Sequence, residues 1–335
     1  MIIVLIIYIL MILYGLKFRK DKNDYLSKDS TGNIKGIFTV MILLSHFRDY
    51  ASFNDNGIYV RFLSLFGQLM VTVFLFYSGY GIMESLKSKK NYMKSFFSNR
   101  FLKTLLHFDL AVILYIIVSF ILGSRYSLLT YLLSFVGWTS VGNSNWFVFV
   151  ILSLYLLTYI SNLIFSNNKK ISLIFTTVLS CLLIITLYFF KEDWWYNIIL
   201  CYPCGMWYSY YKDKIECGIL SKYKYALLVI LIVLFIFLYK NGSNLVIYEL
   251  LACVFCLLII NFTYIFYIGN RILSFLGLYS FEIYILQRIP YSLLFGIFSN
   301  NLVYFIVSLI FTIVIAILFK KLTNFFDKKL FYRGN

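Results

Sequence analysis

Long apolar stretches alternate with short polar segments along the whole chain. Most of them are long enough to form a helix that crosses a hydrocarbon core of about 30 Å. A membrane β-barrel would instead show segments of about ten residues with alternating polarity. The pattern therefore predicts an all-α, polytopic membrane protein, a helical bundle of about 11 transmembrane helices. We place these spans near residues 2–16, 34–50, 60–83, 104–123, 146–165, 171–190, 194–211, 225–239, 244–267, 273–294 and 300–319.

Composition and charge agree with this prediction. Of the 335 residues, 61% are hydrophobic and 13% are charged, whereas a soluble domain carries about 25% charged residues. With the N-terminus placed outside, 24 lysines and arginines fall on the cytoplasmic side and six on the other side. This asymmetry follows the positive-inside rule and predicts a cytoplasmic C-terminus. The net charge of +16 then reflects topology and contact with the lipid bilayer, and it indicates no nucleic-acid partner.

Three regions follow from the spans and the charges. Residues 1–32 form an N-terminal transmembrane anchor with a cytoplasmic basic loop, residues 33–320 form the membrane core, and residues 321–335 form a basic cytoplasmic tail. The first span is followed rather than preceded by basic residues, so we expect it to stay uncleaved. Segment 124–145 is too short and polar to span twice, and we expect it at the outer surface. The bias toward Lys, Ile, Asn and Tyr is typical of AT-rich bacterial genomes, and we expect the bacterial plasma membrane.

Lys35 and His46 are the most informative polar residues, because they lie eleven residues apart on one apolar segment. In a helix this separation places both side chains on one face, about 16 Å apart along the axis. Histidine inside a membrane span is a functional candidate, and its titration near neutral pH suits a general base. A structural histidine bonded to a neighbouring helix is the alternative. The pair suggests a path for a long, anionic, reactive ligand.

The outer end of this segment is unusually polar. Arg48 follows His46 and is suited to neutralise an anionic intermediate or substrate, whereas Asp49 either orients a base or is a solvated loop residue. Asn145 and Trp146, at the outer start of the fifth span, are suited to contact a sugar ring. An interfacial tryptophan anchor is the alternative for Trp146.

The tenth span carries the most polar stripe of the late spans: Ser280, Glu282, Gln287 and Arg288. Glu282, near the middle of the membrane, must face the protein interior or a wet cavity. Gln287 and Arg288 are expected at the depth of His46, where they would form a hydrogen-bonding wall for a hydroxylated substrate. A structural polar network is the competing interpretation.

Arg100 and Lys103 form a second basic site at the cytoplasmic start of a span. In an α-helix the two residues share one face, and such a pair is suited to hold phosphates. His107 and Asp109 follow in the same span, and we interpret them as internal polar contacts.

Two Cys-x-x-Cys patterns are present, at Cys201/Cys204 and Cys253/Cys256. Paired motifs of this kind can bind zinc. Here they fall within or beside apolar spans without nearby histidines, so we expect ordinary helix packing and no metal site.

Taken together, these motifs resemble the membrane-bound acyltransferase family 3, which includes bacterial O-acetyltransferases of surface polysaccharides. The family's Arg or Lys, ten residues and His pattern is matched by Lys35 and His46, and its Arg-x-x-Arg motif by Arg100 and Lys103, with a lysine in the last position. Residues 67–82, 145–156 and 280–290 resemble three further helices of the family. Two features depart from the family pattern: Gln287 stands where a histidine is frequent, and span 2–16 is additional to the usual ten-span core.

The resemblance implies an O-acetyltransferase that moves an acetyl group from cytoplasmic acetyl-CoA to a hydroxyl group of an extracytoplasmic or lipid-linked glycan. A capsular or other surface polysaccharide is the favoured acceptor, and peptidoglycan, a secondary wall polymer and a small secreted metabolite are left open. His46 is then expected to act as a general base, or as a nucleophile that forms acetyl-imidazole. Arg48 and the polar groups of span ten, Glu282 among them, are expected to assist. The expected donor-binding residues are Lys35, Arg100 and Lys103, and the expected acceptor-binding residues are Asn145, Trp146, Ser280, Gln287 and Arg288.

Two other functions remain open at this point. A polysaccharide flippase or other transporter would also explain many spans and intramembrane polar residues, but not the basic residues aligned below one histidine. The absence of an internal repeat in the sequence also counts against it. A glycan polymerase usually needs a large outer loop, whereas the longest outer segment here has 22 residues.

Overall fold

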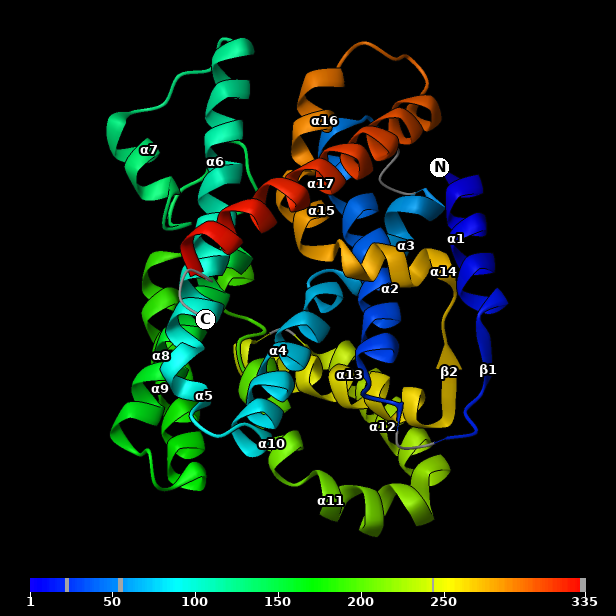
Figure 1. Cartoon of the computed structure of the whole chain (residues 1–335). Helices are drawn as coiled ribbons and strands as arrows, with labels where there is room; N and C mark the ends of the chain where they lie inside the picture. The colour runs from blue at the N-terminus through cyan, green and yellow to red at the C-terminus, as the bar shows by residue number, and fades with distance from the viewer. Residues whose placement is uncertain (22–23, 54–56, 243, 332–335) are drawn as a thin grey trace.

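The computed structural model describes residues 1–21, 24–53, 57–242 and 244–331, whose arrangement is shown in Figure 1. Apart from one two-stranded ribbon, the regular structure in these ranges is helical. The α-helices are α1 (Ile2–Tyr14), α2 (Lys28–Phe47), α3 (Ile58–Phe66), α4 (Leu69–Ser88), α5 (Tyr92–Phe96), α6 (Lys103–Ile121), α7 (Leu128–Ser134), α8 (Trp146–Ile164), α9 (Lys169–Phe190), α10 (Cys201–Tyr210), α11 (Lys212–Ile215), α12 (Ser221–Asn241), α13 (Leu245–Ile265), α14 (Arg271–Leu278), α15 (Ser280–Leu286), α16 (Arg288–Leu294) and α17 (Asn301–Phe331). Short 3₁₀ or π segments are η2 (Arg48–Tyr50), η3 (Phe97–Leu102), η4 (Asp193–Trp195) and η5 (Glu216–Leu220).

Membrane-crossing length is reached by seven helical stretches among the described residues, and a bent pair makes an eighth candidate. The seven are Ile58–Ser88, Tyr92–Ile121, Trp146–Ile164, Lys169–Phe190, Lys212–Asn241, Leu245–Ile265 and Asn301–Phe331. The bent pair, Arg271–Leu278 and Ser280–Leu294, turns by 62°. The predicted all-α, multi-pass membrane architecture is thereby confirmed. The predicted number of eleven is not, since α1 has only 13 residues, α10 only 10, and α2 begins with a polar turn.

Helix α2 runs through the centre of the bundle (Figure 1) and carries both Lys35 and His46. Of its 20 residues, 12 are buried. Its start is capped by Ser27, whose hydroxyl accepts a hydrogen bond from the backbone N–H of Ser30. Gly36 lets α14 pack directly against it, because a Cβ there would lie 2.1 Å from the carbonyl oxygen of Leu273. The N-terminal half of α2 is therefore held by backbone contact, next to Lys35.

A second close crossing joins α4 to α10. A Cβ on Gly79 would lie 2.0 Å from the carbonyl oxygen of Tyr202, and one on Gly205 would lie 2.1 Å from that of Phe76. Small residues allow such close approach between membrane helices. This crossing holds Tyr202 in the interior beside α8, where its hydroxyl is 2.8 Å from that of Thr158.

The only regular sheet in the described part of the chain pairs β1 (Leu16–Phe18) antiparallel with β2 (Phe266–Ile268). Arg19 extends the junction, since its Nε donates to the carbonyl oxygen of Thr263 at 2.7 Å. The open edges of such a ribbon are not stable in lipid. The ribbon therefore joins two loops outside the hydrocarbon, and the sequence places both on the cytoplasmic side.

Segment 124–145 contains the seven-residue helix α7 and is fastened to the end of α9 by Lys191. The Lys191 ammonium lies 4.0 Å from the ring centre of Trp138 and 4.3 Å from that of Trp195. It also donates to the carbonyl oxygen of Trp138 at 2.7 Å. Burial between the two indoles lowers the pKa of Lys191, although neighbouring Glu192 acts in the opposite direction. The contact is a cation–π clamp that holds the segment against the bundle.

Candidate active site

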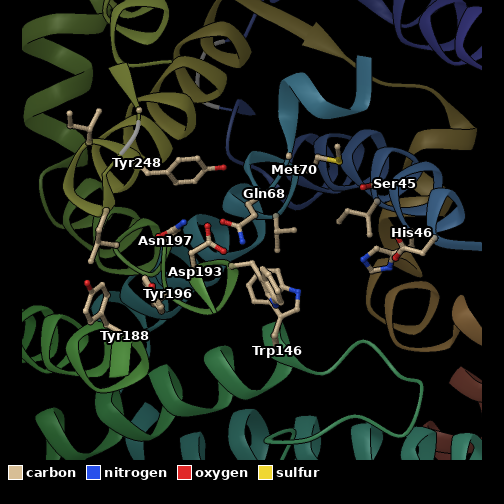
Figure 2. A pocket seen from close by; sticks show the side chains of 18 of the residues that line it. Ser45, His46, Gln68, Met70, Trp146, Tyr188, Asp193, Tyr196, Asn197 and Tyr248 are labelled. Carbon is tan, nitrogen blue, oxygen red and sulfur yellow. The ribbon is translucent and has the colours of Figure 1, made fainter. Parts of the chain in front are cut away.

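A cavity of about 1380 Å³ lies at the C-terminal end of α2 (Figure 2). Its walls come from α2 and η2, the start of α4, the start of α8, the end of α9 with η4, the start of α13, and the α15–α16 segment. The predicted site residues His46, Arg48, Trp146 and Arg288 all line it. The fold thus gathers residues that are up to 242 positions apart in the sequence.

His46 sits in the last turn of α2 and points its ring into this cavity (Figure 2). Its Nδ1 is 2.8 Å from Nε2 of Gln287 and 3.4 Å from the hydroxyl of Ser144. Both contacts use the same ring nitrogen. Nε2 is therefore the nitrogen left to act on a substrate.

Gln287 lies at the junction of α15 and α16 and is fully buried. Its Nε2 also donates to the carbonyl oxygen of Tyr284 at 3.2 Å, while its Oε1 has no hydrogen-bond partner. The structure brings this residue against His46, at the position where the sequence predicted a hydrogen-bonding wall. The contact to the ring, rather than to the open cavity, makes Gln287 a positioning residue for His46.

The guanidinium groups of Arg48 and Arg288 also face the cavity. Nη2 of Arg288 is 3.2 Å from Oδ2 of Asp49, which forms an ion pair, and Nη1 of Arg48 donates to the hydroxyl of Ser64 at 3.4 Å. Asp49 thus contacts Arg288, where the sequence left open a role toward His46 or a solvated loop. Both arginines line the cavity that His46 faces.

The adjacent residues Trp146 and Asn145 have different environments in the structure. Trp146 lines the cavity, but Asn145 is buried and its side-chain N–H donates to the carbonyl oxygen of Gly137 at 2.8 Å. The neighbouring Ser144 contacts His46 instead. Since the backbone conformation of this loop decides which of three consecutive polar residues reaches the histidine, the sequence pattern had no signal for Ser144.

Below the large cavity lies a narrow apolar cavity of about 50 Å³ that follows the same face of α2. Thr39, Ile42, Ser280 and Gln287 are among its lining residues. Thr39 is one turn from Lys35 and donates its hydroxyl proton to the Lys35 carbonyl oxygen at 2.8 Å. The narrow cavity therefore extends from Gln287 toward the Lys35 end of the helix, and it includes the predicted residue Ser280.

Glu282 is buried but lines neither of these two cavities. Its Oε1 is 3.3 Å from Nζ of Lys320 on α17, and Lys320 also donates to the carbonyl oxygen of Leu278. Burial with a cationic partner is what a carboxylate in a membrane interior requires. The expected catalytic role of Glu282 is thus not supported by its position, because an ion pair with α17 holds it away from His46.

Arg100 lies in the π-helical segment η3, a distortion that often marks functional sites. Its Nε donates to the hydroxyl of Tyr92 at 3.2 Å, and its charge acts directly on that of Lys35, eleven residues before His46. Two cations from different helices therefore share one region at the start of α2. No aspartate or glutamate forms an ion pair with either of them in the described residues.

Lys103 is oriented differently, although the sequence expected it on the face of Arg100. Its Nζ is 3.7 Å from Oδ2 of Asp327 on α17, and Nε2 of His107 is 3.1 Å from Oδ1 of the same carboxylate. The π segment has more residues per turn than an α-helix, so the shared-face rule fails across it. The interpretation of His107 as an internal polar contact agrees with this pairing.

The side of the large cavity farthest from His46 carries residues that the sequence analysis did not single out. Figure 2 shows Tyr188, Asp193, Tyr196 and Tyr248 across the cavity from His46. Together with Trp194, which follows Asp193 in η4 and also lines the cavity, we call them the remote wall. Four of them come from the end of α9 and the adjoining η4 segment, where Lys191–Glu–Asp–Trp–Trp–Tyr196 was assigned to the boundary of two spans. Their convergence with Tyr248 depends on how α13 packs, which no local pattern predicts.

The two Cys-x-x-Cys motifs meet where α10 packs on α13. Cys201 and Cys204 lie on α10, and Cys253 and Cys256 lie on α13. Across the described ranges, no group of three or more His, Cys, Asp or Glu residues is arranged to hold a metal ion. The assignment of these cysteines to helix packing stays a prediction.

Comparison with known proteins gives one match. Residues 32–321 match the family model described as an acyltransferase domain. No curated protein and no solved structure matches this chain.

Proposed function

Because this multi-pass membrane protein belongs to the membrane-bound acyltransferase family 3, we propose that it is an O-acetyltransferase of extracytoplasmic glycans. The donor is acetyl-CoA from the cytoplasm, and the acceptor is a hydroxyl group of a capsular or other surface polysaccharide, or of its lipid-linked precursor. One observation carries the proposal: a single buried helix, α2, presents His46 to a large cavity at its C-terminal end and Lys35, eleven residues earlier, to a second cation.

The proposed orientation puts the His46 end outside and the Lys35 end in the cytoplasm of a bacterial cell. Eleven membrane-inserted segments, with the N-terminus outside, follow from the charge asymmetry when α1, α2 and α10 are counted with the longer helices. In this orientation the ribbon of β1 and β2 would lie on the cytoplasmic side.

The donor is proposed to bind along α2. Lys35 and Arg100, which have no carboxylate partner in the described part of the chain, would hold the CoA phosphates. The rise from Lys35 to His46 is about 16 Å, comparable to an extended pantetheine arm. The narrow cavity follows the same face and is apolar, as a passage for that arm should be, and at about 50 Å³ it must widen to admit the arm.

The chemistry is proposed at Nε2 of His46. This nitrogen takes the proton from the acceptor hydroxyl while the hydroxyl oxygen attacks the thioester carbonyl carbon. The C–S bond then breaks, the proton passes to the CoA sulfur, and the products are the acetyl ester and free CoA. Arg48 and Arg288 line the same cavity, where they would stabilise the transient oxyanion.

The tautomer of His46 depends on Gln287. With the Gln287 amide donating to Nδ1, the neutral ring carries its proton on Nε2. Reversing the amide presents Oε1 to Nδ1–H and leaves Nε2 free to accept a proton. The same free Nε2 would be the attacking atom in the alternative mechanism, which proceeds through acetyl-imidazole.

The test is the acetyl content of the host's surface polysaccharide, measured by proton NMR in cells with the wild-type protein, with His46→Ala and without the protein. We expect acetyl signals only with the wild type, at equal membrane levels of both proteins. Full acetylation by His46→Ala would contradict the mechanism. Unchanged acetylation together with a loss of polymer export in cells without the protein would indicate a transporter.

A further inference from the structure

The large cavity has two chemically different sides. His46, Arg48 and Arg288 stand on one side, and the remote wall stands on the other. In Figure 2, Tyr188, Asp193, Tyr196 and Tyr248 lie across the cavity from His46, with Gln68 and Trp146 between them. A ligand that touches both sides must therefore extend across the whole cavity.

The size of the cavity also favours an extended ligand. Its volume of about 1380 Å³ exceeds the roughly 300–1,000 Å³ of most small-molecule sites. A single sugar placed with one hydroxyl at Nε2 of His46 would leave the remote wall unused.

Aromatic rings on the remote wall are open to a ligand. Trp194 is 45% exposed and Tyr188 is 57% exposed, whereas the neighbouring Trp195 is only 5% exposed because it packs under Trp138. Such rings offer flat apolar faces, and tyrosine adds a hydroxyl group for hydrogen bonding. The alternating C–H and O–H groups of a pyranose ring match this combination.

The polar groups of the remote wall exclude other extended ligands. Asp193 and the adjacent Asn197 and Asn244 line this side, and they suit hydroxyl groups better than a lipid chain. The two arginines among the lining residues, Arg48 and Arg288, are not part of the remote wall, so this wall offers no cation for a phosphate. The donor nucleotide is therefore a poor fit here.

We propose that the remote wall is a second sugar subsite, which binds a residue of the acceptor chain other than the one being acetylated. This inference rests on the proposed function and makes it more specific: the acceptor is an oligosaccharide or polymer, in preference to a free sugar or a small metabolite.

The experiment compares acceptors of different length. Polysaccharide from cells lacking the protein is de-O-acetylated, cut by partial acid hydrolysis, and separated into single sugars and oligosaccharides. Transfer of radiolabelled acetyl from acetyl-CoA to each fraction is measured in membranes containing the wild type, Trp194→Ala, Tyr188→Ala or Phe189→Ala. Phe189 is the matched control, because it is 74% exposed, adjoins Tyr188 and does not line the cavity.

We expect the wild type to have a KM for oligosaccharides at least tenfold lower than for single sugars. Trp194→Ala and Tyr188→Ala should each raise the oligosaccharide KM by about 3–10-fold and leave the single-sugar KM unchanged. Phe189→Ala should change neither. Equal wild-type KM values for short and long acceptors, or equal losses on both in the two variants, would overturn the subsite. Failure of the wild type to acetylate any fraction would instead overturn the proposed glycan acceptor itself.

Discussion

Two groups of polar residues that look similar in the sequence differ in the structure in whether their charges are paired. Along α2, His46, Lys35 and Arg100 face a cavity or another cation, and none of them forms an ion pair in the described ranges. Against α17, Glu282 is paired with Lys320, and Lys103 and His107 share Asp327. Charges that neutralise each other stabilise the bundle, whereas uncompensated charges are available to a ligand. The comparison therefore separates residues that are candidates for catalysis or ligand binding from residues that are candidates for stabilising the fold.

The two histidines give the largest expected contrast. His46→Ala should lower the rate of acetyl transfer by about 10²–10⁴-fold, because it removes the group that accepts the hydroxyl proton. His107→Ala should retain most of the activity, since His107 contacts Asp327 and not the cavity. Initial rates in membranes, normalised to protein level, measure both. Comparable losses of activity in the two variants would show that the two histidines do not differ in function as proposed.

The basic residues give the next contrast. Lys35→Gln and Arg100→Gln should each raise the apparent KM for acetyl-CoA by about 10-fold or more, because each removes a charged contact to phosphate. Lys103→Gln should change this KM much less, because its ammonium contacts Asp327. Steady-state kinetics with varied acetyl-CoA provide the measurement. A larger effect at Lys103 than at Arg100 would restore the role predicted from its spacing.

Variants of Gln287 test whether its side chain orients the His46 ring. Gln287→Leu should lower kcat by about 10-fold without changing the KM for acetyl-CoA, since it frees the ring that the amide orients. Gln287→Glu should recover activity, because its carboxylate accepts a hydrogen bond from Nδ1–H and leaves Nε2 free. Its charge favours the protonated ring, so the acid limb of the kcat profile should move to higher pH. If the wild type, Gln287→Leu and Gln287→Glu have pH profiles of the same shape, Gln287 only contributes to packing.

The smallest effect on activity is expected at Glu282. Glu282→Gln should lower the free energy of unfolding by about 1–3 kcal/mol, because Lys320 loses its buried partner. Thermal inactivation in detergent would measure this loss, and the double variant Glu282→Gln/Lys320→Met should regain part of it. Activity below the unfolding temperature should stay near that of the wild type. A loss as large as that of His46→Ala would return Glu282 to the catalytic site.

Part of this fold and site could be predicted from the sequence because it depends on neighbours along one helix. The apolar stretches predicted membrane helices, the eleven-residue spacing predicted that Lys35 and His46 share α2, and the motif order agreed with the family match. Hydrophobic length and helical periodicity are local properties, so the linear pattern contains them. The same local information predicted that Gln287 and Arg288 would accompany His46.

Only the tertiary structure decided which polar groups are paired and which are open. A π turn directs Arg100 and Lys103 to different partners, one loop conformation selects Ser144 over Asn145, and α17 supplies the partners of Glu282 and Lys103. The remote wall likewise forms only when α9, η4 and α13 converge on one cavity. In each case the side chain contacts a segment far away in the chain. The free energy of burying a polar group depends on that partner, which the local sequence pattern cannot predict.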